Sequence, residues 1–202
     1  MSPTLPLCCS PRSFNLMARQ LQSIQSPDAL LHGAIAIAMH QMEDVEPTAV
    51  DATIQGYVDT IRARVRGRQP QAILAHMHDF LFEEQAFRGN SEDYYNPANS
   101  YLPAVVEGKR GLPITLSLLY KVVAERLGLR VWGVGLPGHF LIGMETGGAP
   151  ILVDPFAQGR LLTTDEAHDR LQEMFGPEVQ WSDELLRPAS NRHWLTRILQ
   201  NL

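Results

Sequence analysis

Two side chains in the second half of this sequence have the types and spacing of a general base and of the carboxylate that orients it. His139 lies in the segment PGHFL, and Asp154 follows fifteen residues later in the segment DPF. In thiol-dependent hydrolases a histidine takes and returns the proton, while an aspartate or asparagine holds the imidazole. The thiol stands at a helix N-terminus, where the positive end of the helix lowers its pKa. The sequence therefore predicts two of the three groups of such a site.

The residues around His139 and Asp154 predict the strands that must position them. Short strands are expected over residues 130–135, 139–145 and 151–154. Gly147 and Gly148 mark the turn between the last two of these strands. Because consecutive strands joined by a short turn form a hairpin, the histidine and the aspartate are expected on neighbouring strands.

An apolar helix is expected directly before these strands. It is predicted to begin at Pro113, because the first position of a helix needs no N–H for an intrahelical hydrogen bond. It is predicted to run to Leu127, with Gly128 ending it. Apolar residues occupy nearly every side of this helix, as in a helix that is buried all round. We therefore interpret it as the central helix of the fold. Its main stripe consists of Leu116, Leu119, Tyr120, Val123 and Leu127.

The N-terminal half predicts helices only. Three segments with helical apolar spacing open near Pro27, Pro47 and Pro70, and together they suggest a three-helix unit that ends near Gly89. Further helices are expected over residues 165–175 and at the C-terminal end. A helical unit followed by a buried helix and a small antiparallel sheet is an α+β architecture.

The expected organisation is a single domain behind a short tail. Residues 1–12, rich in Pro and Ser, are interpreted as a flexible tail. The domain over residues 13–202 divides into a helical subdomain, 13–90, a core, 91–176, and a C-terminal helical extension, 177–202.

Composition narrows the classes of partner. The net charge of -5 argues against nucleic acid, which requires a concentrated basic face. No apolar run is long enough to span a membrane, and the start does not look like a signal peptide. The two cysteines, Cys8 and Cys9, are adjacent and form no disulfide framework, so a reducing cytoplasm is expected. No histidine pair has the spacing of a zinc motif, and no cofactor or metal is expected.

Several motifs in the second half resemble the bacterial SirB-type family, whose N-terminal domain is of the transglutaminase-like superfamily. The likeness covers roughly residues 28–200 and is densest in NSYL, GLPITLSLLY, RLGL, PGHFL and DPF. It implies a papain-like α+β fold. Catalytic members of the superfamily carry Gly-x-Cys before a helix that ends in Leu-Gly and an apolar residue. Counted back from Leu127, that cysteine falls at Pro113, while His139 and Asp154 fall at the family's His and Asp positions.

The chain departs from the family at the nucleophile. Proline has no nucleophilic side chain, and Cys8 and Cys9 lie more than a hundred residues upstream. Thr115 is on the same helix but about 200° round from Pro113, so it does not simply replace the thiol. The His139–Asp154 pair has two interpretations: it lines a cleft, or it ties two strands together.

A polar segment before the central helix provides candidate binding residues. These residues either line the cleft or form turns and a helix cap, and Tyr101 is a candidate to reach the His–Asp pair. The candidate binding residues are Asn96, Asn99, Ser100 and Tyr101 of this segment, together with Thr115 of the central helix.

The resulting hypothesis is a degenerate transglutaminase-like domain that binds a peptide or protein. It favours a non-catalytic role over an enzymatic one. One alternative is a hydrolase that uses His139 and Asp154 with water or a hydroxyl, and another is a purely structural domain. The apolar stripe of the last helix either folds back onto the domain or serves as an interface for a homodimer. Its residues are Trp194, Leu195, Ile198, Leu199 and Leu202.

Overall fold

The N-terminal part of the chain is built from helices, four of which precede the first strand. The computed structural model describes residues 10–67, 69–146, 150–176 and 182–202. Proline occupies the first turn of three of these helices, where its fixed φ suits a helix start. The helices are α1 (Pro11–Gln22), α2 (Ala29–Ala38), α3 (Pro47–Arg64) and α4 (Pro70–His78), and α4 continues as a π-helix, η1 (Asp79–Glu84).

Helix α1 was not expected from the sequence. Residues 1–9 of the predicted tail lie outside the described residues, but the prediction is wrong for Pro11 and Arg12, which begin α1. Ser10 caps the helix by accepting a hydrogen bond from the N–H of Ser13 at 3.2 Å. The Ser13 hydroxyl in turn donates to the carbonyl of Ala36 in α2 at 2.7 Å. The Pro- and Ser-rich composition concealed a cap and a helix start.

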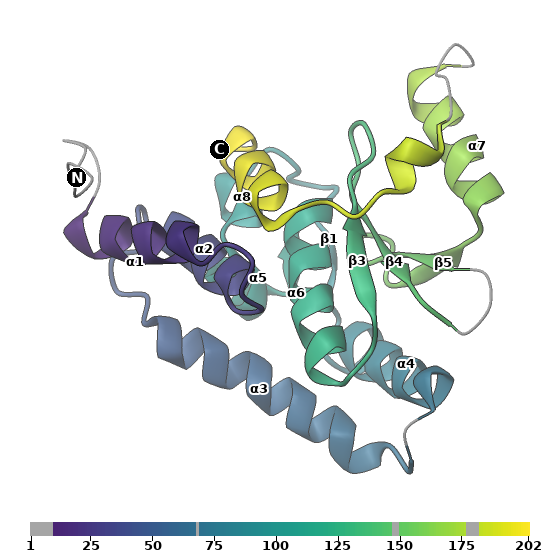
Figure 1. The fold of residues 1–202 in the computed structure, drawn as a ribbon, viewed down its shortest axis with the longest axis horizontal. Helices are drawn as coiled ribbons and strands as arrows, with labels where there is room; N and C mark the ends of the chain where they lie inside the picture. The colour runs from purple at the N-terminus through teal and green to yellow at the C-terminus, as the bar shows by residue number, and fades with distance from the viewer. Residues whose placement is uncertain (1–9, 68, 147–149, 177–181) are drawn as a thin grey trace.

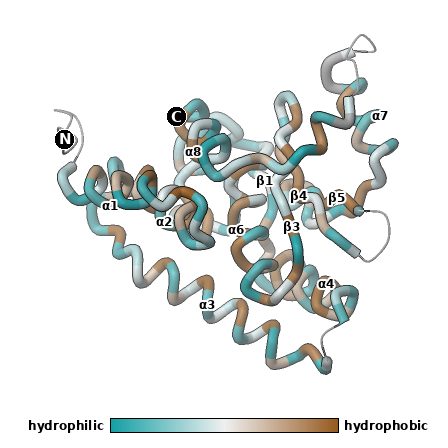
Figure 2. The backbone as a smooth tube through the Cα atoms, viewed as in Figure 1, coloured by the Kyte–Doolittle hydropathy of each residue, from teal (hydrophilic) through white to brown (hydrophobic). Residues whose placement is uncertain are grey.

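Helix α6 (Pro113–Arg126) lies between the N-terminal helices and the sheet (Figure 1), and contacts α2 and α3 as well as the sheet strands. Eleven of its residues are buried, from Pro113 to Ala124, which confirms the prediction of a central helix. Helix α2 is also buried along nearly its whole length, because it packs between α1, α5 and α8. In contrast, α3 alternates hydrophobic and hydrophilic residues (Figure 2) and buries one face through Ile54, Val58 and Ile61.

A four-stranded antiparallel sheet packs against α6. Its strands are β3 (Val131–Val134), β4 (Leu141–Met144), β5 (Ile151–Asp154) and β6 (Arg160–Leu162), in that spatial order. The α+β expectation is therefore confirmed. The strands are shorter than expected, and His139 lies in the turn before β4 and not in the strand. The β3–β4 ladder ends at the pair Val134 and Leu141, and Gly138, with a φ of 62°, lies in the connecting turn.

Shorter elements connect and cover this core. The helix expected over residues 165–175 is α7, and it begins with a reciprocal capping box formed by Thr163 and Glu166. The remaining elements are β1 (Arg88–Gly89), η2 (Pro97–Ser100), α5 (Leu102–Gly108), β2 (Arg110–Gly111), α7 (Thr164–Phe175), η3 (Asp183–Leu186) and α8 (Asn191–Gln200). Strands β1 and β2 pair in parallel. None of the described helices is both long and apolar enough to cross a membrane.

The C-terminal helix folds back onto the domain. Trp194 is fully buried, and its ring centroid lies 4.2 Å from that of Phe140. A side chain at Gly133 would meet the Trp194 ring at 2.3 Å, so the glycine makes room for the indole. Leu199 and Leu202, by contrast, are 55% and 48% exposed. Of the predicted apolar stripe, therefore, only these two leucines are free for another interface.

Candidate functional site

The structure brings His139 and Asp154 into direct contact. His139 occupies the turn between β3 and β4, and Asp154 is the last residue of β5, the neighbour of β4. His139 Nε2 lies 2.9 Å from Asp154 Oδ2. Because an ionised carboxylate can only accept, this hydrogen bond assigns the proton to Nε2 and leaves the lone pair of a neutral imidazole on Nδ1. That arrangement is the one a general base needs.

Both oxygens of the Asp154 carboxylate accept hydrogen bonds. Its Oδ1 accepts from the N–H groups of Phe156 at 3.0 Å and Ala157 at 3.2 Å, while Arg170 of α7 donates to Oδ2. Burial opposes ionisation of this fully buried group, but the hydrogen bond from His139, the Ala157 N–H and the charge of Arg170 together lower its pKa. The carboxylate is therefore ionised and fixed in place.

His139 and Pro113 line the same small cavity, of about 100 Å³. The imidazole packs edge-on against Phe156 at 6.1 Å, and its side chain keeps 14% of its surface exposed. The position assigned to the missing cysteine and the candidate base thus face one space. The described lining consists of Tyr94, Pro113, Ile114, Gly138, His139, Phe140, Arg197 and Asn201.

Within this described lining there is no thiol and no aliphatic hydroxyl. The one hydroxyl belongs to Tyr94, and burial raises the pKa of that phenol, which weakens it as a nucleophile. Thr115 is buried and lies outside the lining, and its Oγ1 has no hydrogen-bond partner among the described residues. Ser117 donates to the carbonyl of Phe140 at 3.2 Å. Neither hydroxyl stands in for the thiol.

Of the polar residues predicted before the central helix, none lines the cavity. Asn96 caps η2 by accepting from the Ala98 N–H at 2.9 Å. Asn99 is buried and donates to the carbonyls of Asp93 at 2.6 Å and Tyr94 at 3.1 Å. Ser100 is buried with a hydroxyl that has no partner among the described residues, and Tyr101 is half-buried. Asn99 therefore contacts the backbone of Tyr94, whose residue lines the cavity.

Three residues that sequence reasoning did not single out complete the site. Tyr94 lines the cavity and packs edge-on against Phe156 at 6.1 Å. Arg170 contacts Asp154, and Arg197 of α8 lines the cavity. Tyr94 could have been noticed in the sequence because it lies two residues before the segment NPANSYL, which begins at Asn96. No motif in the sequence points to Arg170 or Arg197.

Three further polar side chains, those of Lys109, Arg110 and His78, have partners outside this cavity. Lys109 Nζ lies 2.5 Å from the Tyr57 hydroxyl, and Arg110 pairs with Glu92 at 2.9 Å. His78 Nε2 lies 2.8 Å from the Tyr120 hydroxyl, and burial lowers its pKa to about 4. No group of three His, Cys, Asp or Glu that could hold a metal occurs among the described residues.

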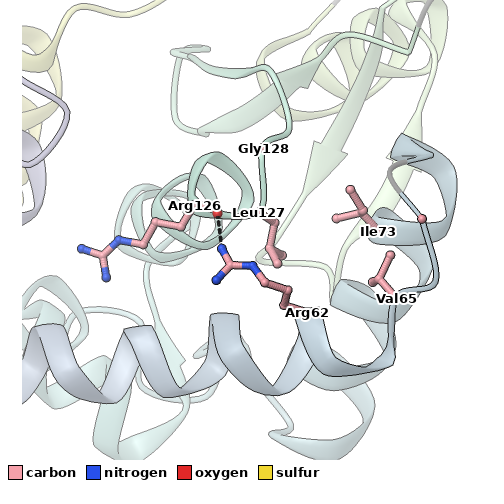
Figure 3. Close-up of a pocket in the computed structure, with 7 residues that line it drawn as sticks. Arg62, Val65, Ile73, Arg126, Leu127 and Gly128 are labelled. Carbon is pink, nitrogen blue, oxygen red and sulfur yellow. Dashed lines mark hydrogen bonds between the residues drawn. The ribbon is translucent and has the colours of Figure 1, made fainter.

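A larger cavity, of about 460 Å³, lies at the opposite end of α6 (Figure 3). Arg62 reaches across it from α3 and donates to the carbonyl of Arg126 at 2.8 Å, and Arg126 itself pairs with Asp51 at 2.5 Å. Both guanidinium groups are thus engaged, and the described lining holds no histidine, cysteine or carboxylate. This cavity is larger than the one beside His139, but the acid–base pair lies at the smaller one.

A family model described as the transglutaminase-like superfamily matches residues 48–200, which include His139 and Asp154. No solved structure matches the chain.

Similar curated proteins come from bacteria and from mammals. A UPF0162 protein of Xylella fastidiosa is 35% identical over 177 residues, covering 86% of this chain and 63% of that protein. A UPF0162 protein of Pseudomonas aeruginosa is 30% identical over 183 residues, covering 88% and 65%. Human F-box only protein 21 is 30% identical over 177 residues, covering 71% of this chain and 28% of its own. The chain thus spans less than two thirds of the length of these relatives.

Proposed function

We propose, from the premise that this chain belongs to the transglutaminase-like superfamily, that it performs no covalent catalysis and binds a peptide or protein segment at the cavity beside His139. The observation that carries this proposal is the lining of that cavity, which contains Pro113 where catalytic relatives carry cysteine and, among the described residues, no thiol or aliphatic hydroxyl. The motifs GLPITLSLLY, PGHFL and DPF further support a SirB-type assignment within the superfamily.

The size and lining of the cavity suit one side chain of a bound segment. Its volume of about 100 Å³ compares with roughly 30 Å³ for each water molecule in the liquid, so it holds a group of a few heavy atoms. Ile114 and Phe140 offer apolar surface, while Tyr94, His139, Arg197 and Asn201 offer polar groups. A few placed polar groups in an apolar setting are typical of specific binding sites.

A display experiment tests this proposal. A phage-displayed random-peptide library would be panned on the protein, and the selected peptides measured by fluorescence anisotropy. We expect Tyr94→Ala, which removes one wall of the cavity, to weaken these peptides by about tenfold, and Tyr95→Ala, which changes a side chain outside the lining, to leave them unchanged. Failure to select any peptide, or equal affinity for both variants, would count against binding at this cavity.

A hydrolase that activates water is the second candidate. It is supported by the ionised Asp154, by the assignment of the Nε2 proton and by the partial exposure of His139. In that case the hydrolysis of p-nitrophenyl acetate should be lost on His139→Ala and kept on His40→Ala, which changes an exposed histidine outside the cavity. Equal rates for the wild type and both variants would reject this candidate.

A further inference from the structure

We infer that the cavity beside His139 recognises a carboxylate group and that Arg197 is the cation that binds it. The inference rests on the proposed function, since it names the chemistry of the segment that the cavity takes. The carboxylate belongs either to an acidic side chain or to a peptide C-terminus.

Arg197 is placed at the cavity by contacts with the turn that carries His139. Its Nη2 donates to the carbonyl of Leu136 at 3.1 Å and to that of His139 at 3.3 Å. Its Cζ lies 5.2 Å from the centroid of the Phe140 ring. The guanidinium is therefore held in one position while it lines the cavity, and its other N–H groups have no hydrogen bond among the described residues.

The guanidinium lacks a counter-ion. Among the described residues no Asp or Glu oxygen lies within ion-pair distance of Arg197. Each of the other described arginines that are partly buried contacts a carboxylate, namely Arg64, Arg110, Arg126 and Arg170. Partial burial of this group lowers its pKa, so the structure bears a desolvation cost that no carboxylate of the described residues offsets. An anion in the cavity would offset that cost.

The rest of the described lining favours a single negative charge. Tyr94 and Asn201 carry hydrogen-bond donors, and no carboxylate is among the lining residues. Asp154 stands behind His139, fully buried and occupied by His139, Arg170 and two backbone N–H groups. One guanidinium balances one carboxylate, and its planar fork matches a carboxylate in shape.

The test uses small probes observed by ¹H–¹⁵N NMR at the amides of Gly138 and His139. The probes are N-acetyl-glutamate amide, with a side-chain carboxylate, N-acetyl-alanine, with a terminal carboxylate, N-acetyl-glutamine amide, which is neutral, and O-phosphoserine. We expect one or both carboxylate probes to bind about tenfold more tightly than the glutamine probe, and the tighter of the two identifies the source of the carboxylate.

Matched variants assign the effect to Arg197. Arg197→Gln should lower the affinity for the carboxylate probe by about tenfold, while Arg192→Gln, an exposed position on the same helix, should not change it. Asn201→Asp places a competing carboxylate at the exposed rim of the cavity and should weaken binding of the probe by more than Asn201→Ala, which only removes a hydrogen-bond donor. Because the Asn201 variants leave the contacts of Arg197 with the turn intact, they test the site even if Arg197→Gln unfolds the protein.

The outcomes separate this inference from the proposed function. Equal affinity for the glutamine and glutamate probes, or tighter binding of phosphoserine, would overturn carboxylate recognition. Either result would leave unaffected the proposed binding of a peptide or protein segment at the cavity. If no probe shifts Gly138 or His139, the inference is rejected; the peptide selection then decides the proposed function separately.

Discussion

At the scale of single residues, the site depends on how Asp154 is held. This side chain has no exposed surface, and its two oxygens accept hydrogen bonds from His139, Arg170 and two backbone N–H groups. The same contacts would serve an oriented base or a structural tie between strands. What distinguishes these roles is His139, which keeps part of its side chain exposed toward a cavity rather than being sealed.

The lowered pKa of Asp154 gives a prediction about pH. Because the carboxyl has a lower pKa in the folded than in the unfolded chain, its contribution to stability is present above about pH 4 and is lost as the pH falls through the folded value. Asp154→Asn should therefore destabilise the protein by about 2–3 kcal/mol at pH 7, and by progressively less below pH 4. Urea unfolding of wild type and variant across this range measures the difference.

The exposed Asp165 serves as a control, since Asp165→Asn should change the free energy of unfolding by no more than about 0.5 kcal/mol at any pH. A difference between wild type and Asp154→Asn that stays constant from pH 7 to pH 3 would show that the carboxylate is not held in its ionised form.

At the scale of elements, the cavity exists because α8 docks against β3 and the following turn. Trp194 lies against Gly133 and Phe140, and the next turn of the same helix brings Arg197 to the backbone of Leu136 and His139. A change in how α8 packs would therefore move Arg197 relative to the cavity.

Gly133→Ala tests this coupling. A methyl group there would meet the fully buried Trp194 ring at 2.3 Å, so we expect a loss of about 1–3 kcal/mol in the free energy of unfolding and altered NMR signals at Gly138 and His139. Gly56→Ala is the matched control, since nothing lies within 4 Å of the added methyl in α3 and stability should rise by about 0.5–1 kcal/mol. Unchanged stability and signals in Gly133→Ala would disprove the coupling.

Comparison of these elements with the sequence shows which ones pattern alone can predict. The central helix, the sheet strands and the His139–Asp154 pair follow from apolar periodicity and short-range spacing. Tyr94, Arg170 and Arg197 do not, because their role depends on how a loop and helices α7 and α8 dock in three dimensions. Arginines on amphipathic helices mostly face solvent, so neither position stood out.

At the scale of the whole molecule, the apolar stripe of α8 leaves only a small exposed surface for self-association. We keep a homodimer through α8 as a proposal that rests on the exposed Leu199 and Leu202, since the other apolar residues of the stripe pack inside the domain. The double variant Leu199→Ser, Leu202→Ser should then sediment as a monomer where the wild type sediments as a dimer. Leu161→Ser, which alters an exposed leucine on β6, should not change the mass. A wild type that stays monomeric with rising concentration would rule the dimer out.

The relation between Pro113 and His139 is most directly tested by restoring the thiol. In a Cys8→Ser, Cys9→Ser background, the rate of alkylation of Pro113→Cys by iodoacetamide would be measured against pH, with Pro47→Cys as the control at the same position of α3. The account predicts a thiol pKa at Pro113→Cys below that of the control and below the ordinary value of about 8.5, and a return toward the control on His139→Ala. Equal pKa values at both positions, unaffected by His139→Ala, would contradict the claim that this cavity is a transglutaminase-like site lacking its nucleophile.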